Sequence, residues 1–206
     1  MDLQEKTMFG PGVATEVVVR SERFKFNAAH FVAFDGYRER LHGHNYTVAV
    51  RLLGPTSVKD GYVLDFTEIK KVVRGVCEEL NERFLCPVKS DVMVLAEDEL
   101  NVILSCQDGS YFSIPRDDCA MLPIVHSTAE ELACLVWRRT VEAFGVDRLQ
   151  KRGITSMEIA VAEAPTQEAR YLRPIADYDA AQENEQTREP IRASACSAFA
   201  VKKASP

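Results

Sequence analysis

The chain has 206 residues, of which 46% are hydrophobic and 27% charged, and its formal net charge at pH 7 is −6. These values are ordinary for one globular domain with extensions. The acidic balance argues against a general binder of nucleic acid or anionic membranes. No apolar run approaches the roughly 18–20 residues that span a membrane.

The N-terminus, MDLQEKTMFG, lacks the charged-then-apolar layout of a secretory signal. No two cysteines form a CxxC pair, and several lie in apolar segments, so we interpret them as reduced thiols of a cytoplasmic protein. The six are Cys77, Cys86, Cys106, Cys119, Cys134 and Cys196.

The composition divides the chain into three parts. Residues 1–14 predict a flexible N-terminus, and residues 15–174 carry the periodic apolar patterns of one folded domain. Residues 175–206 are rich in Ala, Glu, Gln, Lys and Arg without a period, which predicts a disordered tail.

Two long strands are predicted first, over 15–31 and from His42 to Val50, with a polar loop at 35–40 between them. Apolar residues alternate along both strands, and strands this close in sequence most simply form an antiparallel hairpin. On the first strand, the shared apolar face carries Phe24, Phe26, Ala28 and His30.

Helical periodicity follows over 67–80 and again over 128–144, where Ser127 or Thr128 can cap the helix. Between the helices, residues 91–114 predict short strands with a hairpin turn at Asp108-Gly109. A last strand is predicted over 154–163, ended by Pro165. This order of elements predicts an α+β domain.

Three of the four histidines gather on the first hairpin. His42 and His44 lie two apart on a strand and therefore point to one side, and His30 lies on the apolar face of the partner strand. Three convergent imidazoles with a vacant fourth position are typical of catalytic Zn²⁺. Alternatively, each is a hydrogen-bonded core or surface histidine. His126 precedes the second helix and is either a cap or loop residue or a pocket acid/base.

Glu163 ends the last strand on the same face as Met157, Ile159 and Val161. A carboxylate in such an apolar environment needs a partner. That partner is either an internal arginine or a row of backbone N–H groups, or else the edge of a ligand with paired N–H donors.

Five motifs, in order along residues 20–171, resemble those of the 6-pyruvoyl-tetrahydropterin synthase superfamily. They are FNAAH (26–30), LHGHNY (41–46), GYVLDF (61–66), STAEELA (127–133) and AVAEA (160–164). The resemblance implies a T-fold, a four-stranded antiparallel sheet with two helices on one face. It also implies homotrimers or homohexamers whose sheets close into a barrel with pterin sites between subunits.

The resemblance further implies that His30, His42 and His44 hold zinc. Glu163 would anchor the pterin ring, and Thr128 and Glu130 would line the pocket.

Two positions depart from the best-known members of this family. Those members use a cysteine just before the HGH motif and an Asp-His pair after the first helix. This chain has no cysteine in that loop, and Asn81-Glu82 corresponds to the pair. The loop resembles a branch in which a glutamate, here Glu39, replaces the cysteine. Glu39 could instead be a solvated partner of Arg38 or Arg40, and Glu82 a surface residue.

The combined expectation is a zinc-dependent lyase that acts on the small molecule 7,8-dihydroneopterin triphosphate, with Glu39 and Glu82 as catalytic candidates. Side-chain cleavage to 6-hydroxymethyl-7,8-dihydropterin, as in folate synthesis, is favoured over triphosphate elimination. Arg38 and Arg40 could then point outward to receive the phosphates. The alternatives are a pterin-binding or regulatory member without the family reaction, and a zinc enzyme of another reaction class.

Overall fold

The computed structural model describes residues 14–57 and 59–179. Its main sheet has six strands in the order β11-β10-β4-β1-β5-β9. They are β1 (Thr15–His30), β4 (His42–Gly54), β5 (Arg83–Pro87), β9 (Cys119–Leu122), β10 (Ser156–Ala164) and β11 (Gln167–Pro174). The first four in sheet order are antiparallel, whereas β5 and β9 are added in parallel beside β1. The predicted four-stranded antiparallel sheet is confirmed, with two short strands added to one edge.

The long hairpin of β1 and β4 sets the position of the histidines. Its register pairs His30 with His42 and Ala28 with His44. The predicted apolar face is confirmed, because Phe24, Phe26, Ala28 and His30 are all buried. An irregularity between Arg20 and Lys25 inserts extra residues into β1. Such bulges bend a strand and increase its twist.

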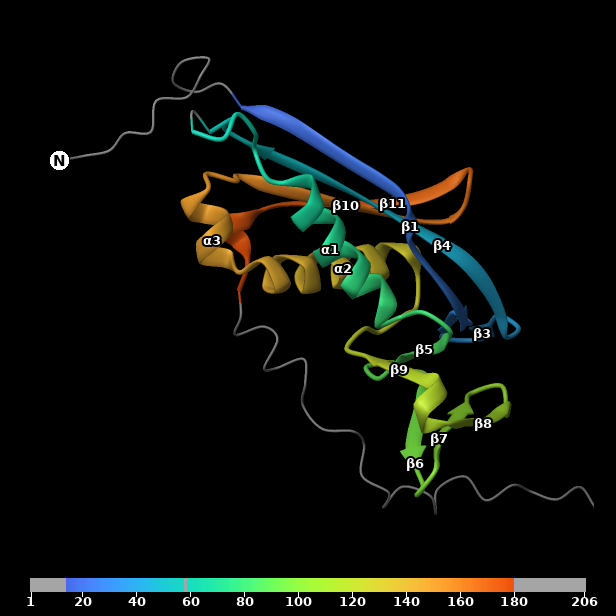
Figure 1. The fold of residues 1–206 in the computed structure, drawn as a ribbon. Helices are drawn as coiled ribbons and strands as arrows, with labels where there is room; N and C mark the ends of the chain where they lie inside the picture. The colour runs from blue at the N-terminus through green and yellow to red at the C-terminus, as the bar shows by residue number, and fades with distance from the viewer. Residues whose placement is uncertain (1–13, 58, 180–206) are drawn as a thin grey trace, which may run out of the picture.

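Three helices cover one face of the antiparallel sheet (Figure 1). They are α1 (Phe66–Glu78), α2 (Ala129–Phe144) and the short α3 (Val146–Lys151). Asp65 caps α1 by accepting a hydrogen bond from the Thr67 N–H at 2.6 Å, and Thr128 caps α2. The two predicted helices are confirmed to within two residues at each end, while α3 was not expected.

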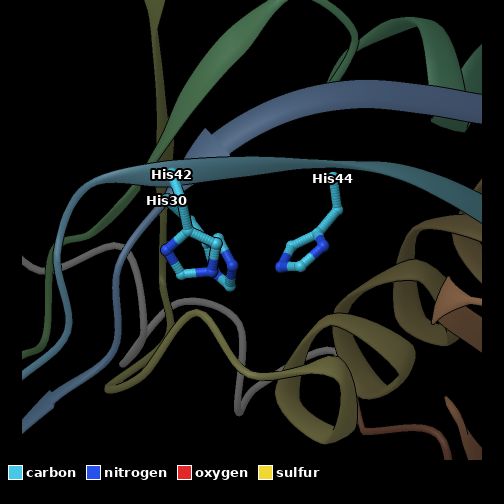
Figure 2. A group of neighbouring side chains, drawn as sticks. All are labelled: His30, His42 and His44. Carbon is cyan, nitrogen blue, oxygen red and sulfur yellow. The ribbon is translucent and has the colours of Figure 1, made fainter.

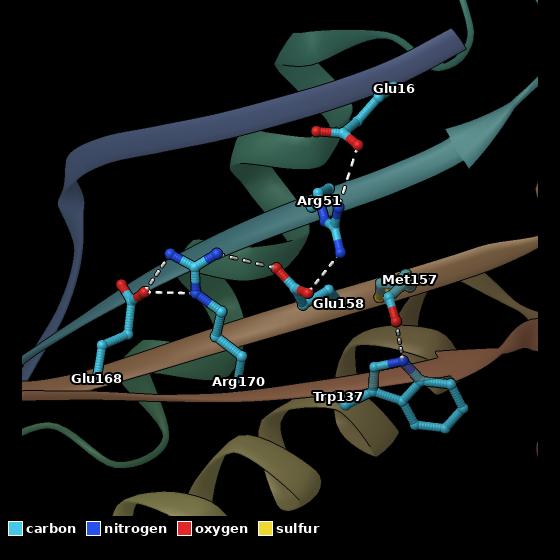
Figure 3. Close-up of polar contacts among 7 residues, drawn as sticks. All are labelled: Glu16, Arg51, Trp137, Met157, Glu158, Glu168 and Arg170. Atoms are coloured by element: carbon cyan, nitrogen blue, oxygen red, sulfur yellow. Dashed lines mark hydrogen bonds and ion pairs between the residues drawn. The ribbon is translucent and has the colours of Figure 1, made fainter. Parts of the chain in front are cut away.

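Trp137 of α2 ties the helical layer to the sheet. Its indole Nε1–H donates to the Met157 carbonyl of β10 at 2.9 Å (Figure 3), and the residue is fully buried. A buried indole usually finds such a partner, so this bond fixes the approach of α2 to β10.

Charged side chains form a row across the sheet on the face opposite the helices. Glu158 lies between Met157 and Ile159, whose side chains are in the core, so its own side chain points to the other face. The row runs over four strands as Glu16, Arg51, Glu158, Arg170 and Glu168 (Figure 3).

A second, smaller sheet packs at the end where β5 and β9 lie. It consists of β6 (Met93–Glu97), β7 (Asn101–Cys106) and β8 (Tyr111–Pro115), followed by the 3-10 helix η1 (Arg116–Asp118). The predicted turn at Asp108-Gly109 is confirmed, with φ of +81° at Gly109, a conformation that glycine adopts without strain. This sheet shares a core with Phe31 and Phe84, separate from the main core.

The loop predicted between the two long strands contains a miniature hairpin, β2 (Ala33–Phe34) and β3 (Tyr37–Arg38). Gly36 occupies its turn with φ of +76°. The segment connecting the zinc-ligand candidates is therefore a structured element.

The C-terminal part continues beyond the predicted last strand. After Pro165 the chain turns back as β11, and past residue 174 it forms the 3-10 helix η2 (Ile175–Asp177), in which Ile175 is buried. Of the predicted flexible N-terminus (1–14), residues 1–13 lie outside the described residues, as do residues 180–206 of the predicted tail (175–206). The cysteines within the described ranges are free, and Cys196 lies outside them. None of the helices in the described ranges is long and apolar enough to cross a membrane.

Candidate functional site

The three predicted histidines converge. Their side chains project from β1 and β4 to the same side of the sheet, toward the loop that leads into α2 (Figure 2). Ring centroids lie 4.6 Å apart for His30 and His42, 5.0 Å for His30 and His44, and 4.9 Å for His42 and His44. One ligand nitrogen from each ring lies within 4.8 Å of the others.

Backbone carbonyls orient two of these rings. Nδ1 of His30 lies 2.9 Å from the Ser127 carbonyl oxygen, and Nδ1 of His42 lies 2.7 Å from that of Arg40. Because a carbonyl only accepts, both Nδ1 atoms carry the proton and both Nε2 atoms keep a lone pair. Nε2 of His30 is buried and has no hydrogen-bond partner within the described residues. Histidines that bind a metal through Nε2 usually donate their Nδ1–H to a carbonyl in this way.

The pKa of His30 favours the neutral form of the ring. Burial lowers the pKa of His30 below its ordinary value, and it outweighs the opposing effect of the Ser127 hydrogen bond. The neutral ring is thereby favoured, and only the neutral ring binds a metal ion.

Gly43, between His42 and His44, is required by close packing of the two strands. A Cβ atom at this position would lie 2.9 Å from the Ala28 carbonyl oxygen. Any larger residue would push β4 away from β1 and disturb the register that aligns the histidines.

Glu163 lies at a bulge near the end of β10, where two residues of β10 oppose one of β11. Its carboxylate accepts a hydrogen bond of 3.4 Å from the hydroxyl of Tyr46, a fully buried residue stacked on Phe26. Burial, and then the negative charge of Glu163, raise the pKa of Tyr46, so its hydroxyl stays protonated and acts as the donor. Tyr46 was not predicted as a site residue, although its alternation with His44 places it on the same face.

Glu39 is held from both its backbone and its side chain. Its N–H donates to the Val32 carbonyl at 2.9 Å, and its Oε2 accepts from the Val32 N–H at 3.0 Å. The charge of Glu39 also contributes to the raised pKa of Tyr46, which places this carboxylate near the same interior. The alternative in which the Glu39 carboxylate pairs with Arg38 is not seen, because the Arg38 guanidinium pairs with Asp108.

One cavity of about 580 Å³ collects most of the predicted site residues. Its lining includes six of the eight candidates: His30, His42, Glu39, Glu163, Glu130 and Thr128. Metal-ligand candidates and carboxylates thus face one space, which can admit a small molecule.

The N-terminus of α2 forms one wall of this cavity. Thr128 Oγ1 accepts from the Glu131 N–H at 3.4 Å, while the Glu131 carboxylate accepts from the Val125 and His126 N–H groups. Thr128 is therefore a helix cap and a lining residue at once. His126 is a loop residue bonded through its backbone, outside the lining of this cavity.

Glu82 lies elsewhere in the single chain. It lines a second cavity of about 600 Å³ with Gly43 and Asp118, and not the cavity of Glu39. Its backbone is left-handed, with φ of +57°, and its N–H donates to the Asn27 carbonyl at 2.6 Å. The Asn27 N–H in turn donates to Asn81 Oδ1 at 2.9 Å. The structure therefore does not bring Glu82 and Glu39 together within one subunit.

The fold and the site define an α+β protein of the T-fold class with a three-histidine cluster arranged to hold a metal ion. The family model described as 6-pyruvoyl tetrahydropterin synthase matches residues 20–174, and the chain belongs to this family.

Relatives within the family carry different names. The crystal structure of 6-pyruvoyl tetrahydropterin synthase from Plasmodium vivax is 41% identical, has a TM-score of 0.77, and covers 79% of this chain and 99% of that one. Structures of the same Plasmodium vivax protein have also been solved with a catalytic glutamate replaced by alanine or by cysteine.

Two other relatives differ in activity. The dihydroneopterin monophosphate aldolase of Pyrococcus furiosus is 46% identical over 63 residues, which is 31% of this chain and 53% of that protein. The 6-carboxy-5,6,7,8-tetrahydropterin synthase of Haemophilus influenzae is 26% identical over 124 residues, covering 58% and 79% respectively.

Proposed function

We propose that the protein is a zinc-dependent lyase that cleaves the side chain of 7,8-dihydroneopterin triphosphate and releases 6-hydroxymethyl-7,8-dihydropterin. The observation that carries this proposal is the shared cavity of Glu39, two of the three histidines and Glu163. The cavity combines a carboxylate for the base, two of the three metal-ligand candidates and a carboxylate for the ring. Its lining within the described residues includes no cysteine.

The residues present fit a zinc ion. Three imidazoles offer ligand nitrogens within 4.8 Å of one another, and the buried Nε2 of His30 has no other partner in the described part of the chain. Three nitrogen ligands and a position left for substrate are the usual set of catalytic zinc. Zinc bound there would acidify substrate hydroxyls, as it lowers the pKa of bound water to about 7.

Glu163 would orient the pterin. A carboxylate accepts two hydrogen bonds from adjacent N–H groups, and the 2-amino and N3 positions of a pterin offer such a pair. The Tyr46 hydroxyl supports one oxygen of Glu163 from the buried side. The side chain at C6 of the pterin would then extend toward the histidines and Glu39.

Glu39 would move the proton. The Val32 N–H engages only its Oε2, so Oε1 is available to take the proton of the second side-chain hydroxyl. As this hydroxyl becomes a carbonyl, the bond between the first and second side-chain carbons breaks. Its electron pair is taken up by the conjugated C6–N5 imine of the ring, and the proton is finally delivered to the first carbon. The second product is a triphosphorylated two-carbon aldehyde.

Two relatives support parts of this proposal. The Pyrococcus furiosus relative is an aldolase, which breaks the same kind of bond, and the catalytic residue exchanged in the Plasmodium vivax protein is a glutamate. We propose that a carboxylate in place of a cysteine favours side-chain cleavage over triphosphate elimination.

We also propose that the site is completed by a second copy of the chain in a homotrimer or homohexamer. The long edge strand β11 has unpaired backbone groups, which a neighbouring subunit can pair. Glu82 could reach the Glu39 cavity only from another subunit. Light scattering at micromolar concentration should give three or six times the mass of the chain, and a monomer mass would remove the intersubunit site.

The function is tested by incubating the purified protein with 7,8-dihydroneopterin triphosphate and identifying the products by mass. The parent should release 6-hydroxymethyl-7,8-dihydropterin. Glu39→Gln should lower turnover by about 10²–10⁴, the usual scale of general acid–base catalysis, while zinc content persists. The matched control is Glu99→Gln, an exposed carboxylate between β6 and β7, which should turn over like the parent. A parent that binds pterin but forms no product would favour a binding or regulatory role.

A further inference from the structure

Arg38 immediately precedes Glu39, yet its side chain points away from the cavity and into the second sheet. Its Nε donates to Asp108 Oδ2 at 2.8 Å, and its Nη2 donates to Ser110 Oγ at 2.7 Å. Its third bond, from Nη1, goes to the main-chain carbonyl of Glu39 at 2.6 Å. The side chain is only 15% exposed. It is therefore not available to receive substrate phosphates.

The guanidinium also lies against two aromatic rings. Its Cζ is 5.4 Å from the centroid of Phe31 and 5.3 Å from that of Phe112, and these rings stack on each other at 5.1 Å. Phe31 directly follows the zinc-ligand candidate His30, and Phe112 belongs to β8. Arg38 thus joins the end of β1 to the second sheet through contacts that a lysine cannot reproduce together.

The turn that receives Arg38 is already organised. Asp108 Oδ1 accepts from the Ser110 N–H at 2.9 Å, and Ser110 Oγ donates to Asp108 Oδ2 at 2.9 Å. These hydrogen bonds, together with Arg38, hold the pKa of Asp108 below its ordinary value. The turn therefore offers a fixed negative charge that neutralises the arginine.

These contacts leave Glu39 with little freedom. Its carbonyl is bound by Arg38, its N–H by the Val32 carbonyl and its carboxylate by the Val32 N–H. A catalytic group displaced by about 1 Å can lose about 10² in rate, so such restraint matters for proton transfer.

We propose that Arg38, anchored by Asp108 and Ser110 of the second sheet, is a positioning residue that fixes Glu39 at the reaction cavity. The inference rests on the proposed role of Glu39 as the base. It also assigns a purpose to the second sheet, which contributes no residue to the lining of that cavity within the described part of the chain.

The test begins with Arg38→Met, which keeps the length of the side chain but removes its donors. We expect kcat to fall by about 10–10² because Glu39 is misplaced, with KM changed by less than about threefold. The kcat values of Arg38→Lys and Asp108→Asn should lie between those of Arg38→Met and the parent. Exchange of the Val32 and Glu39 amide hydrogens should accelerate in Arg38→Met.

Arg152 offers a matched control. It donates to the Val63 and Tyr62 carbonyls and to Asp60, and its guanidinium lies 5.0 Å from the Tyr62 ring, so it makes the same kinds of contact away from the cavity. Arg152→Met should lower the melting temperature but leave kcat and the exchange at Val32 unchanged. An equal loss of kcat in both variants would overturn the positioning role.

The double variant Arg38→Met/Glu39→Gln separates this inference from the proposed function. If Arg38 acts through Glu39, the double variant should be no slower than Glu39→Gln alone. If the losses of kcat in the two single variants multiply in the double variant, the positioning role is overturned and Glu39 remains the base. The same conclusion follows if Arg38→Met turns over like the parent while Glu39→Gln is impaired. A parent-like Glu39→Gln would overturn both.

Discussion

Replacing Glu163 should change pterin binding without changing the stability of the fold. Replacing Glu163 with glutamine keeps the shape of the side chain and an oxygen that can accept from Tyr46. It places an NH₂ group where the second carboxylate oxygen stood, so one of two paired N–H donors of a pterin loses its acceptor. A hydrogen bond to a charged group contributes about 1.5–3 kcal/mol, so pterin affinity should fall about 10- to 150-fold.

The fold should change little in the same variant. Within the described residues, the Glu163 carboxylate accepts one hydrogen bond, the 3.4 Å bond from Tyr46, which is at the long end for a hydrogen bond. Its replacement by a neutral acceptor should alter the free energy of unfolding by less than about 1 kcal/mol. Calorimetric titration with a pterin and a thermal melt measure the two effects separately.

Glu168→Gln is the control for the general charge of the cavity. Glu168 lines the same cavity, but its carboxylate pairs with Arg170 on β11. Its replacement should change pterin affinity by less than about threefold, since exposed ion pairs contribute little. If Glu163→Gln binds pterin like the parent while its melting temperature drops strongly, Glu163 is a structural residue and the argument for the ring-binding role fails.

Three further predictions concern the metal, the core and the strained backbone. His42→Ala and His44→Ala should each lose most of their zinc by elemental analysis, and full occupancy in both would remove the metal site. Trp137→Phe loses the donor to Met157 and fills less volume, so it should cost about 1–3 kcal/mol in chemical denaturation, and a parent-like midpoint would contradict the packing argument. Glu82→Gly should raise the free energy of unfolding by up to about 1 kcal/mol, because glycine accepts the φ of +57° without strain, whereas a large loss would show that the Glu82 side chain supports the fold.

Periodicity predicted the parts of the fold that bury apolar faces. The alternation around Phe26 and Tyr46 located the β1–β4 hairpin, and the apolar stripes located α1 and α2. The strand β11 was missed because its residues are mostly exposed or half-buried, with Glu168 and Arg170 on the surface. Its identity as a strand comes from pairing with β10 rather than from its own pattern.

The candidate site was predicted where its signal is local. His42 and His44 share a face through their spacing, and the structure brings His30 to them through the register of the hairpin. The anchor of Arg38 depends on Asp108, 70 residues away, and no local pattern connects the two. Whether Glu82 joins Glu39 depends on the arrangement of subunits, which a pattern within one chain does not contain.

The central claim is tested most directly by one measurement on metal-free protein. After removal of metal by a chelator, the protein is incubated with 7,8-dihydroneopterin triphosphate before and after addition of one equivalent of zinc, and the products are identified by mass. Our account predicts 6-hydroxymethyl-7,8-dihydropterin only after zinc is added. Equal product formation without zinc, or a 6-pyruvoyl product in place of the cleaved one, would contradict it.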